Sequence, residues 1–197
     1  MKKLGFTLAE VLLTLVIIGV VAAMTVPSLM KNTNEEEYRT AAKKAITSAG
    51  QALTLHYALE NMWAQDYSTA KDLVENVFKK RLNTIEYTGT EGYTVGECDD
   101  PETTFATQDG MIFCINNWYV GDTEKQTEAC NSYNTRPCTN GNHANLWVDV
   151  NGEKGPNRIT RSSQQPKDVY QAQIYNQKVV PFGTAAQEVM YNKEVKY

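Results

Sequence analysis

The chain has 197 residues, 42% of them hydrophobic and 21% charged, and its formal net charge is -4. This length is enough for one domain of ordinary size, or for one domain with an anchor. The composition excludes a multi-span membrane protein, a disordered tail protein and a basic nucleic-acid binder.

The first element in the chain is an apolar segment over residues 6–30. Of these 25 residues 18 are apolar, and Glu10 is the only charged one. As a helix rising ~1.5 Å per residue, the segment spans roughly 37 Å, more than the ~30 Å hydrocarbon core of a bilayer. Lys2 and Lys3 precede it, and the next basic residue is Lys31. This asymmetry predicts a cytoplasmic N-terminus, with the bulk of the chain across the membrane.

The charge of Glu10 distinguishes between the possible roles of this segment. A secretory signal peptide has an apolar stretch of only ~7–15 residues, in which an early charge is unusual. A plain signal anchor fits the length but leaves a carboxylate that costs roughly 2.5–3.5 kcal/mol in the bilayer, unless it snorkels to the interface. A cut between Gly5 and Phe6 would create an α-ammonium on the same helical face as Glu10, where the two charges can pair.

The residues around this bond form a specific pattern. The basic leader KKLG at 2–5 is followed by FTLAE at 6–10 and then by a long apolar run. The pattern, about 27 residues in all, resembles the class III leader of type IV pilins and type II secretion pseudopilins. The resemblance implies that a prepilin peptidase cuts after Gly5 and methylates the new amine of Phe6. It also implies that Glu10 guides assembly by neutralising the Phe6 amine of an adjacent subunit.

The helix is expected to continue past the apolar segment. After Lys31, apolar residues recur at three- and four-residue intervals with charged residues between them, which is typical of an amphipathic helix. One helix is therefore predicted from Phe6 to about Trp63, with one half anchored and a stripe of the other half packed on a globular head. Pro27 lacks a backbone donor and clashes with the preceding turn, so a kink or loosening is expected near 23–27. The alternative is two helices with a break between Pro27 and Thr33.

A second helix and several strands are predicted after this point. Thr69 and Asp72 have the spacing of a capping box, and apolar residues over 73–82 share one face of the helix that would follow. Two strands, over 104–108 and 111–118, flank an Asp-Gly pair that predicts a two-residue hairpin turn.

Further strands are predicted over 146–150, before an Asn-Gly pair, and near 174–180. A long helix followed by antiparallel strands predicts an α+β fold. The resemblance implies the same architecture, a pilin fold in which the C-terminal half of the helix packs on a small antiparallel β-sheet head.

Four cysteines lie in the part of the chain expected outside the cytoplasm, where disulfides form. They are Cys98, Cys114, Cys130 and Cys138. Four cysteines permit three pairings, and we favour Cys98 with Cys114 and a local loop closed by Cys130 and Cys138. No pair has the C-x-x-C spacing, so a zinc ribbon is not expected.

The segment 149–157 supports two interpretations. Side-chain oxygens at alternate positions, in Asp149, Asn151 and Glu153, are candidate Ca²⁺ ligands, and the segment resembles a stretch in pseudopilin-like heads, some of which bind calcium. It departs from an EF-hand loop because glycine stands fourth and no glutamate stands twelfth. In the other interpretation Asp149 and Asn151 hydrogen-bond their own backbone in a tight turn. Asp168 is expected to complete either arrangement.

Catalysis is not expected, because the sequence has no glycine-rich phosphate loop, no G-x-S-x-G and no H-E-x-x-H. Removing Lys2 and Lys3 with the leader leaves 17 basic against 23 acidic side chains, a balance of -6 that opposes nucleic-acid binding. The predicted organisation is a leader peptide at 1–5, a transmembrane and filament-core helix at 6–30 and an extracytoplasmic head at 31–197.

The functional prediction is a structural subunit of a type IV pilus-like or type II secretion pseudopilus filament. The alternative is a minor pilin at a filament tip, whose head binds a surface, a secreted substrate or DNA. The resemblance implies other pilin-like subunits, the prepilin peptidase and an inner-membrane assembly platform as partners. It places the chain in the inner membrane as a single-pass protein, and afterwards in a periplasmic or cell-surface filament.

Overall fold

The computed structural model describes residues 7–119, 143–159, 167–175 and 178–182. The longest element is α1 (Leu8–Glu60), one helix of 53 residues, which at ~1.5 Å per residue is about 80 Å long. It ends where Asn61 adopts the left-handed conformation (φ 54°) and donates its backbone N–H to the Tyr57 carbonyl oxygen at 2.9 Å. Asparagine tolerates this cap conformation better than most residues. The single long helix is confirmed, although it ends at Glu60 rather than near Trp63.

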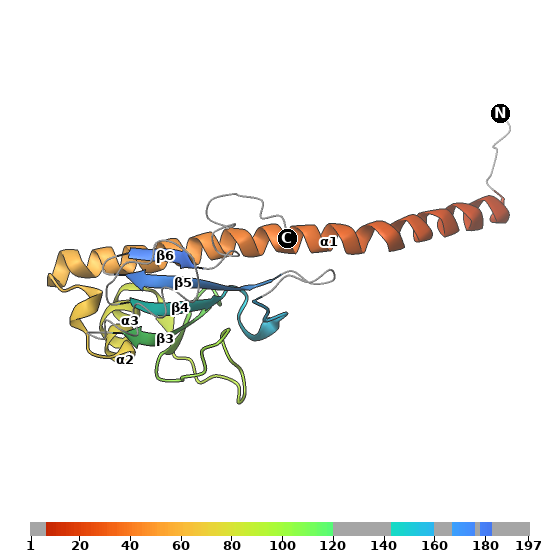
Figure 1. Cartoon of the computed structure of the whole chain (residues 1–197). Helices are drawn as coiled ribbons and strands as arrows, with labels where there is room; N and C mark the ends of the chain where they lie inside the picture. The colour runs from red at the N-terminus through yellow and green to blue at the C-terminus, as the bar shows by residue number, and fades with distance from the viewer. Residues whose placement is uncertain (1–6, 120–142, 160–166, 176–177, 183–197) are drawn as a thin grey trace.

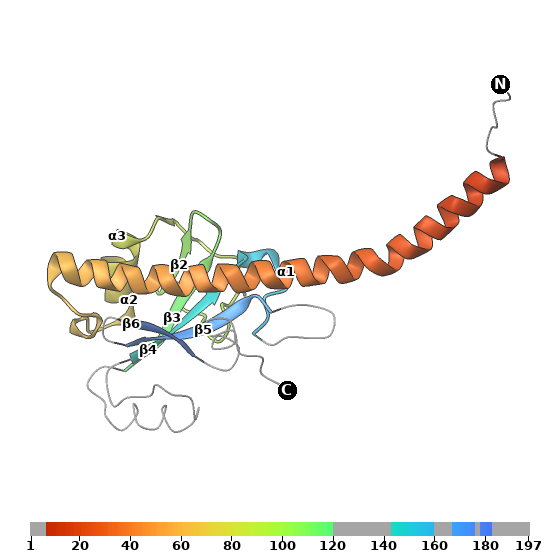
Figure 2. The ribbon, with the colours of Figure 1, turned by 90° about the horizontal axis from the view of Figure 1, so that it is seen from above.

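Helix α1 passes through Pro27 without interruption. Figure 2 shows its N-terminal half curving away from the line of the C-terminal half. A proline inside a helix removes one backbone hydrogen bond and crowds the preceding turn, which bends a helix more readily than it ends one when the rest of the helix is well formed. The alternative of two helices with a break between Pro27 and Thr33 is wrong.

A second helical segment follows the short 3₁₀ turn η1 (Ala64–Asp66). It consists of α2 (Ala70–Leu73), the π-helical turn η2 (Val74–Phe78) and α3 (Lys79–Arg81). The predicted cap is present, because Thr69 Oγ1 accepts the backbone N–H of Asp72 at 3.0 Å. The apolar residues of this segment are buried against α1 and the sheet: Leu73, Val74, Val77 and Phe78.

Within the described residues, six antiparallel strands form one sheet in the order of the chain. They are β1 (Thr84–Ile85), β2 (Thr104–Thr107), β3 (Ile112–Tyr119), β4 (His143–Asp149), β5 (Val169–Tyr175) and β6 (Lys178–Phe182). Each strand pairs only with its neighbours in sequence, so the fold is α+β, as predicted. The apolar residues near 174–180 belong to two paired strands, β5 and β6, and the two-residue β1 has too little pattern to be predicted.

The turn between β2 and β3 is longer than expected. Thr107 donates its backbone N–H to the Met111 carbonyl oxygen at 2.9 Å, so three residues form the loop rather than two. Gly110 has φ 87°, a conformation that glycine adopts without a steric penalty and that closes three-residue hairpin loops. The prediction of a hairpin at this place is confirmed, and the predicted turn type is wrong.

The sheet has a different cover on each face. The C-terminal half of α1 lies along one face, as both views show (Figures 1 and 2), and its small side chains allow close approach: Ala42, Ala45, Ala49 and Ala52. They pack with Phe105, Phe113 and Leu146 from the strands. On the other face a smaller cluster, which includes Trp147 and Cys114, lies beneath the segment between β1 and β2.

Candidate functional site

The N-terminal half of α1 has no apolar partner in the described part of the chain. Its 20-residue stretch Leu8–Pro27 is long and apolar enough to cross a membrane, and none of it is buried against the head. Ile17, for example, is 54% exposed, whereas Ile46 in the other half of the same helix is 2% exposed. An exposed apolar surface of this size marks a membrane or protein interaction site.

Glu10 lies in the first turn of this exposed half, where it forms a capping box with Thr7. Glu10 Oε2 accepts the Thr7 backbone N–H and the Thr7 hydroxyl, each at 2.8 Å, and Thr7 Oγ1 accepts the Glu10 backbone N–H at 3.3 Å. The carboxylate therefore caps the helix that carries it. Sequence reasoning missed this role, although the spacing Thr-x-x-Glu at 7–10 predicts it. Gly5 and Phe6, the predicted processing site, lie outside the described residues.

Two buried carboxylates lie at the end of β4 and just before the start of β5. Asp149 and Asp168 are both fully buried. Asp149 accepts the Tyr93 hydroxyl at 2.8 Å and the Asn151 backbone N–H at 3.1 Å. Asp168 accepts the backbone N–H groups of Asn157 at 2.9 Å and of the next residue at 2.7 Å. Hydrogen-bond donors from the chain thus compensate both groups, as buried polar groups require.

Asn151 joins these carboxylates to the long helix. Its Nδ2 donates to Asp168 Oδ2 at 3.2 Å and to the Tyr38 hydroxyl of α1 at 3.1 Å. Burial raises the pKa of Asp149 to about 7, against the opposing hydrogen bond from Tyr93. Burial likewise raises the pKa of Asp168 above its ordinary value. Asp168 therefore joins the arrangement at 149–151 through its hydrogen bond with Asn151, as expected from the sequence.

The three candidate calcium ligands are not brought together. Asp149 and Asn151 share the turn, whereas Glu153 accepts the Tyr87 hydroxyl at 2.7 Å and the backbone N–H and hydroxyl of Thr90. Among the described residues no three carboxylate, histidine or cysteine side chains are placed to hold a metal ion. Calcium binding stays a prediction, which the melting temperature measured with Ca²⁺ and with a chelator tests.

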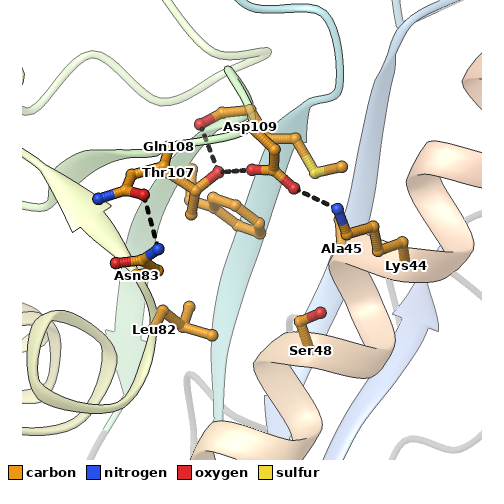
Figure 3. Close-up of a pocket in the computed structure, with 10 residues that line it drawn as sticks. Lys44, Ala45, Ser48, Leu82, Asn83, Thr107, Gln108 and Asp109 are labelled. Atoms are coloured by element: carbon orange, nitrogen blue, oxygen red, sulfur yellow. Dashed lines mark hydrogen bonds and ion pairs between the residues drawn. The ribbon is translucent and has the colours of Figure 1, made fainter.

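A pocket of about 330 Å³ lies where the C-terminal half of α1 meets the β2–β3 hairpin (Figure 3). Lys44 Nζ from the helix and Asp109 Oδ2 from the hairpin lie 2.6 Å apart. Burial alone would raise the pKa of Asp109, but hydrogen bonds from Lys44 and Thr107 outweigh it and lower the pKa. Opposite this ion pair, Asn83 Nδ2 donates to Gln108 Oε1 at 2.7 Å. These two pairs occupy polar groups of the pocket, and the Lys44–Asp109 pair ties the helix to the hairpin.

A disulfide joins Cys98, in the segment between β1 and β2, to Cys114 on β3, with their Cα atoms 5.9 Å apart. It is one of the two bridges favoured from the sequence, and it attaches the segment to the sheet that it covers. Cys130 and Cys138, the other favoured pair, lie outside the described residues.

These features define a class of protein: an α+β head carried on a long helix, half of which has an exposed apolar surface suited to a membrane or a filament. Residues 1–26 match the family model described as the prokaryotic N-terminal methylation motif. The match supports a class III prepilin-like leader over these residues, of the kind that type IV pilins and pseudopilins carry. No curated protein and no solved structure gives a significant match.

Proposed function

We propose that the protein is a structural subunit of a type IV pilus-like or type II secretion pseudopilus filament. One observation carries the proposal: the helix that begins at Leu8, within the methylation motif matched over residues 1–26, is continuous from an exposed apolar half into a half packed on the head. A membrane anchor alone would not require a rigid connection to the head. A filament subunit does, because the head must keep a defined position relative to the filament core.

The exposed half of α1 would have two successive environments. Before assembly, its 20-residue stretch Leu8–Pro27 would span the hydrocarbon core at ~1.5 Å per residue. In the filament, the same side chains would pack against the helices of neighbouring subunits, which removes them from both lipid and water. The proposed boundaries are a leader at 1–5, this helix at 6–30 and an extracytoplasmic head at 31–197.

Processing prepares Glu10 for its proposed role in assembly. The prepilin peptidase would cut between Gly5 and Phe6 and methylate the new amine, and Glu10 would then neutralise the Phe6 amine of an adjacent subunit. Such a pair satisfies two charges that would each be costly in an apolar filament core. The proposed partners are other pilin-like subunits and an inner-membrane assembly platform. The proposed locations are the inner membrane and then a periplasmic or cell-surface filament.

Mass spectrometry of the mature protein tests this proposal. We expect an N-terminal N-methylated Phe6 in cells that contain the peptidase, and an unprocessed Met1 in cells that lack it. A mature chain that begins after Ala23, as a signal peptidase would leave it, would overturn the proposal. Copy number in purified filaments then separates the two kinds of subunit: a major subunit greatly outnumbers a tip pilin whose head binds a surface, a secreted substrate or DNA.

A further inference from the structure

The segment between β1 and β2 forms a pocket on the face of the head opposite α1. The pocket has a volume of about 360 Å³, and its lining includes Tyr87, Tyr93, Glu91 and Asp99. The two tyrosines are half-buried on the apolar cluster around Trp147, whereas both carboxylate residues are exposed. This volume lies in the range of small-ligand and side-chain sites. We call it the tyrosine–carboxylate pocket.

The charge around this pocket has one sign. Residues 86–102 contain six acidic residues and no basic one: Glu86, Glu91, Glu97, Asp99, Asp100 and Glu102. All six are exposed, and Lys71 pairs with Glu102 at 2.6 Å. No ion pair joins Glu91 or Asp99 to a basic side chain among the described residues. A pocket lined by one sign of charge attracts ligands of the other sign.

Contacts within the head hold the pocket in shape. The Tyr87 hydroxyl donates to Glu153 at 2.7 Å and the Tyr93 hydroxyl to Asp149 at 2.8 Å. Gly96 has φ +66°, and a Cβ atom there would lie 2.2 Å from the Trp147 ring, so the segment approaches the sheet as closely as glycine alone allows. The Cys98–Cys114 disulfide fixes the same segment to β3. A site that is ordered before binding loses less entropy when a ligand enters.

The ligand follows from what remains available in the pocket. Because the tyrosine hydroxyls donate to Glu153 and Asp149, a ligand meets the aromatic rings and the carboxylates of Glu91 and Asp99, which form no ion pair within the described part of the chain. Rings attract a cation over their faces, and carboxylates form charge-assisted hydrogen bonds with guanidinium groups. An anion would be repelled, and a neutral ligand would leave the carboxylates without a charged partner.

We propose that the tyrosine–carboxylate pocket binds the guanidinium of an arginine side chain presented by a partner protein. This site lies in the head, away from the membrane-spanning half of α1, and the inference does not depend on filament formation. It gives the head a recognition function for basic segments of other proteins.

The test uses the full-length protein in detergent micelles and two peptides, acetyl-Gly-Arg-Gly-amide and its citrulline counterpart. Citrulline has nearly the shape of arginine but no charge. In an NMR titration we expect the arginine peptide to bind with a dissociation constant in the low-millimolar range or below, and to shift signals of residues 87–99. We expect the citrulline peptide to bind at least about fivefold more weakly, as the loss of one charge-assisted contact predicts. Equal binding of the two peptides, or no binding of either, would overturn the proposal.

Variants distinguish a built pocket from general attraction by the acidic segment. Glu91→Gln and Asp99→Asn should each weaken binding of the arginine peptide about threefold to fivefold. Glu97→Gln is the matched control, because Glu97 is exposed in the same segment but does not line the pocket, and it should change binding less than twofold. An equal loss in all three variants would show a diffuse field and contradict the proposed site. Unchanged melting temperatures verify that each variant is folded, and filament assembly should be unaffected.

Discussion

The two halves of α1 have similar backbones and opposite surroundings. In the C-terminal half, alanine and larger apolar residues alternate with charged ones, and the apolar stripe packs against the sheet. In the N-terminal half, apolar residues surround the helix and remain exposed. A stripe of apolar residues can be covered by one sheet, whereas a helix that is apolar all round needs a partner on every side. The comparison shows how a single helix can be packed on a folded head at one end and leave an apolar surface for the proposed assembly at the other.

The largest expected effect comes from the single charge of the exposed half. Glu10→Ala should leave membrane insertion intact and reduce filament yield at least about tenfold, because an ammonium left unpaired in an apolar core costs ~3–5 kcal/mol. Membrane fractionation and electron microscopy of sheared filaments measure the two outcomes. Glu37→Ala, an exposed glutamate in the other half of α1, is the control and should assemble normally. If the Glu10→Ala variant forms normal filaments, Glu10 does not have the proposed role in assembly.

Matched isoleucine substitutions separate the two halves directly. Ile46→Ala should lower the free energy of unfolding of the head by about 2–5 kcal/mol, because it leaves a cavity in the core where Ile46 is 2% exposed. Ile17→Ala should change head stability by less than about 0.5 kcal/mol and should instead weaken assembly. Denaturant unfolding in micelles, followed by tryptophan fluorescence, gives the comparison. Equal destabilisation by both variants would mean that the halves are not energetically distinct.

A pH titration tests the buried network that reaches α1 through Tyr38. The pKa of Asp149 is about 7 in the folded chain and near its ordinary 3.8 in the unfolded chain. Between these values the folded state holds a proton that the unfolded state has lost. The stabilisation that this bound proton gives to the folded state is therefore complete below the ordinary pKa, and it is lost as the pH rises through about 7.

With a chelator present, the free energy of unfolding should fall by roughly 2 kcal/mol between pH 5 and pH 7, at ~1.4 kcal/mol per pH unit. Asp149→Asn should flatten this slope, whereas Asp99→Asn, an exposed aspartate, should leave it unchanged. A slope that is the same in Asp149→Asn and in the parent chain would mean that another group carries it.

The smallest expected effect concerns the ion pair between α1 and the hairpin. Lys44 and Asp109 side chains are 60% and 37% exposed, and solvent screens such pairs to below about 1 kcal/mol. Lys44→Ala should lower the free energy of unfolding by less than that amount, and high salt should remove the difference. Lys43→Ala, the neighbouring exposed lysine, should have no effect. A loss of several kcal/mol would show that the pocket, rather than the burial of Ile46, holds the helix on the head.

Local patterns made much of the fold predictable. The spacing of apolar residues predicted the long helix, Thr69 predicted the start of the second helical segment, and the Asp-Gly pair predicted the β2–β3 hairpin. Each signal acts over a few residues, so it survives without knowledge of the tertiary fold. The Thr7–Glu10 capping box is equally local, because the Thr-x-x-Glu spacing at 7–10 is enough to predict it.

Contacts between residues far apart in the chain could not be predicted from local sequence patterns. Glu153 reaches Tyr87 and Thr90, 66 and 63 residues away in the chain, and no periodicity records such a pairing. The same holds for Asn151, which bonds to Tyr38 across 113 residues. Oxygen-bearing side chains at alternate positions of a sequence can suggest calcium ligands, but only the fold decides whether those side chains come together.

The sequence alone determined the leader, the apolar segment, the single charge within it and the periodicity of the helix that continues from it, because all of these depend on residue type and spacing along one element. The tertiary structure decided which apolar residues are covered, since that depends on which strands pack against the helix. It also turned the acidic segment between β1 and β2 into a pocket, because the disulfide, the glycine over Trp147 and the two tyrosine hydrogen bonds act only when the sheet is formed.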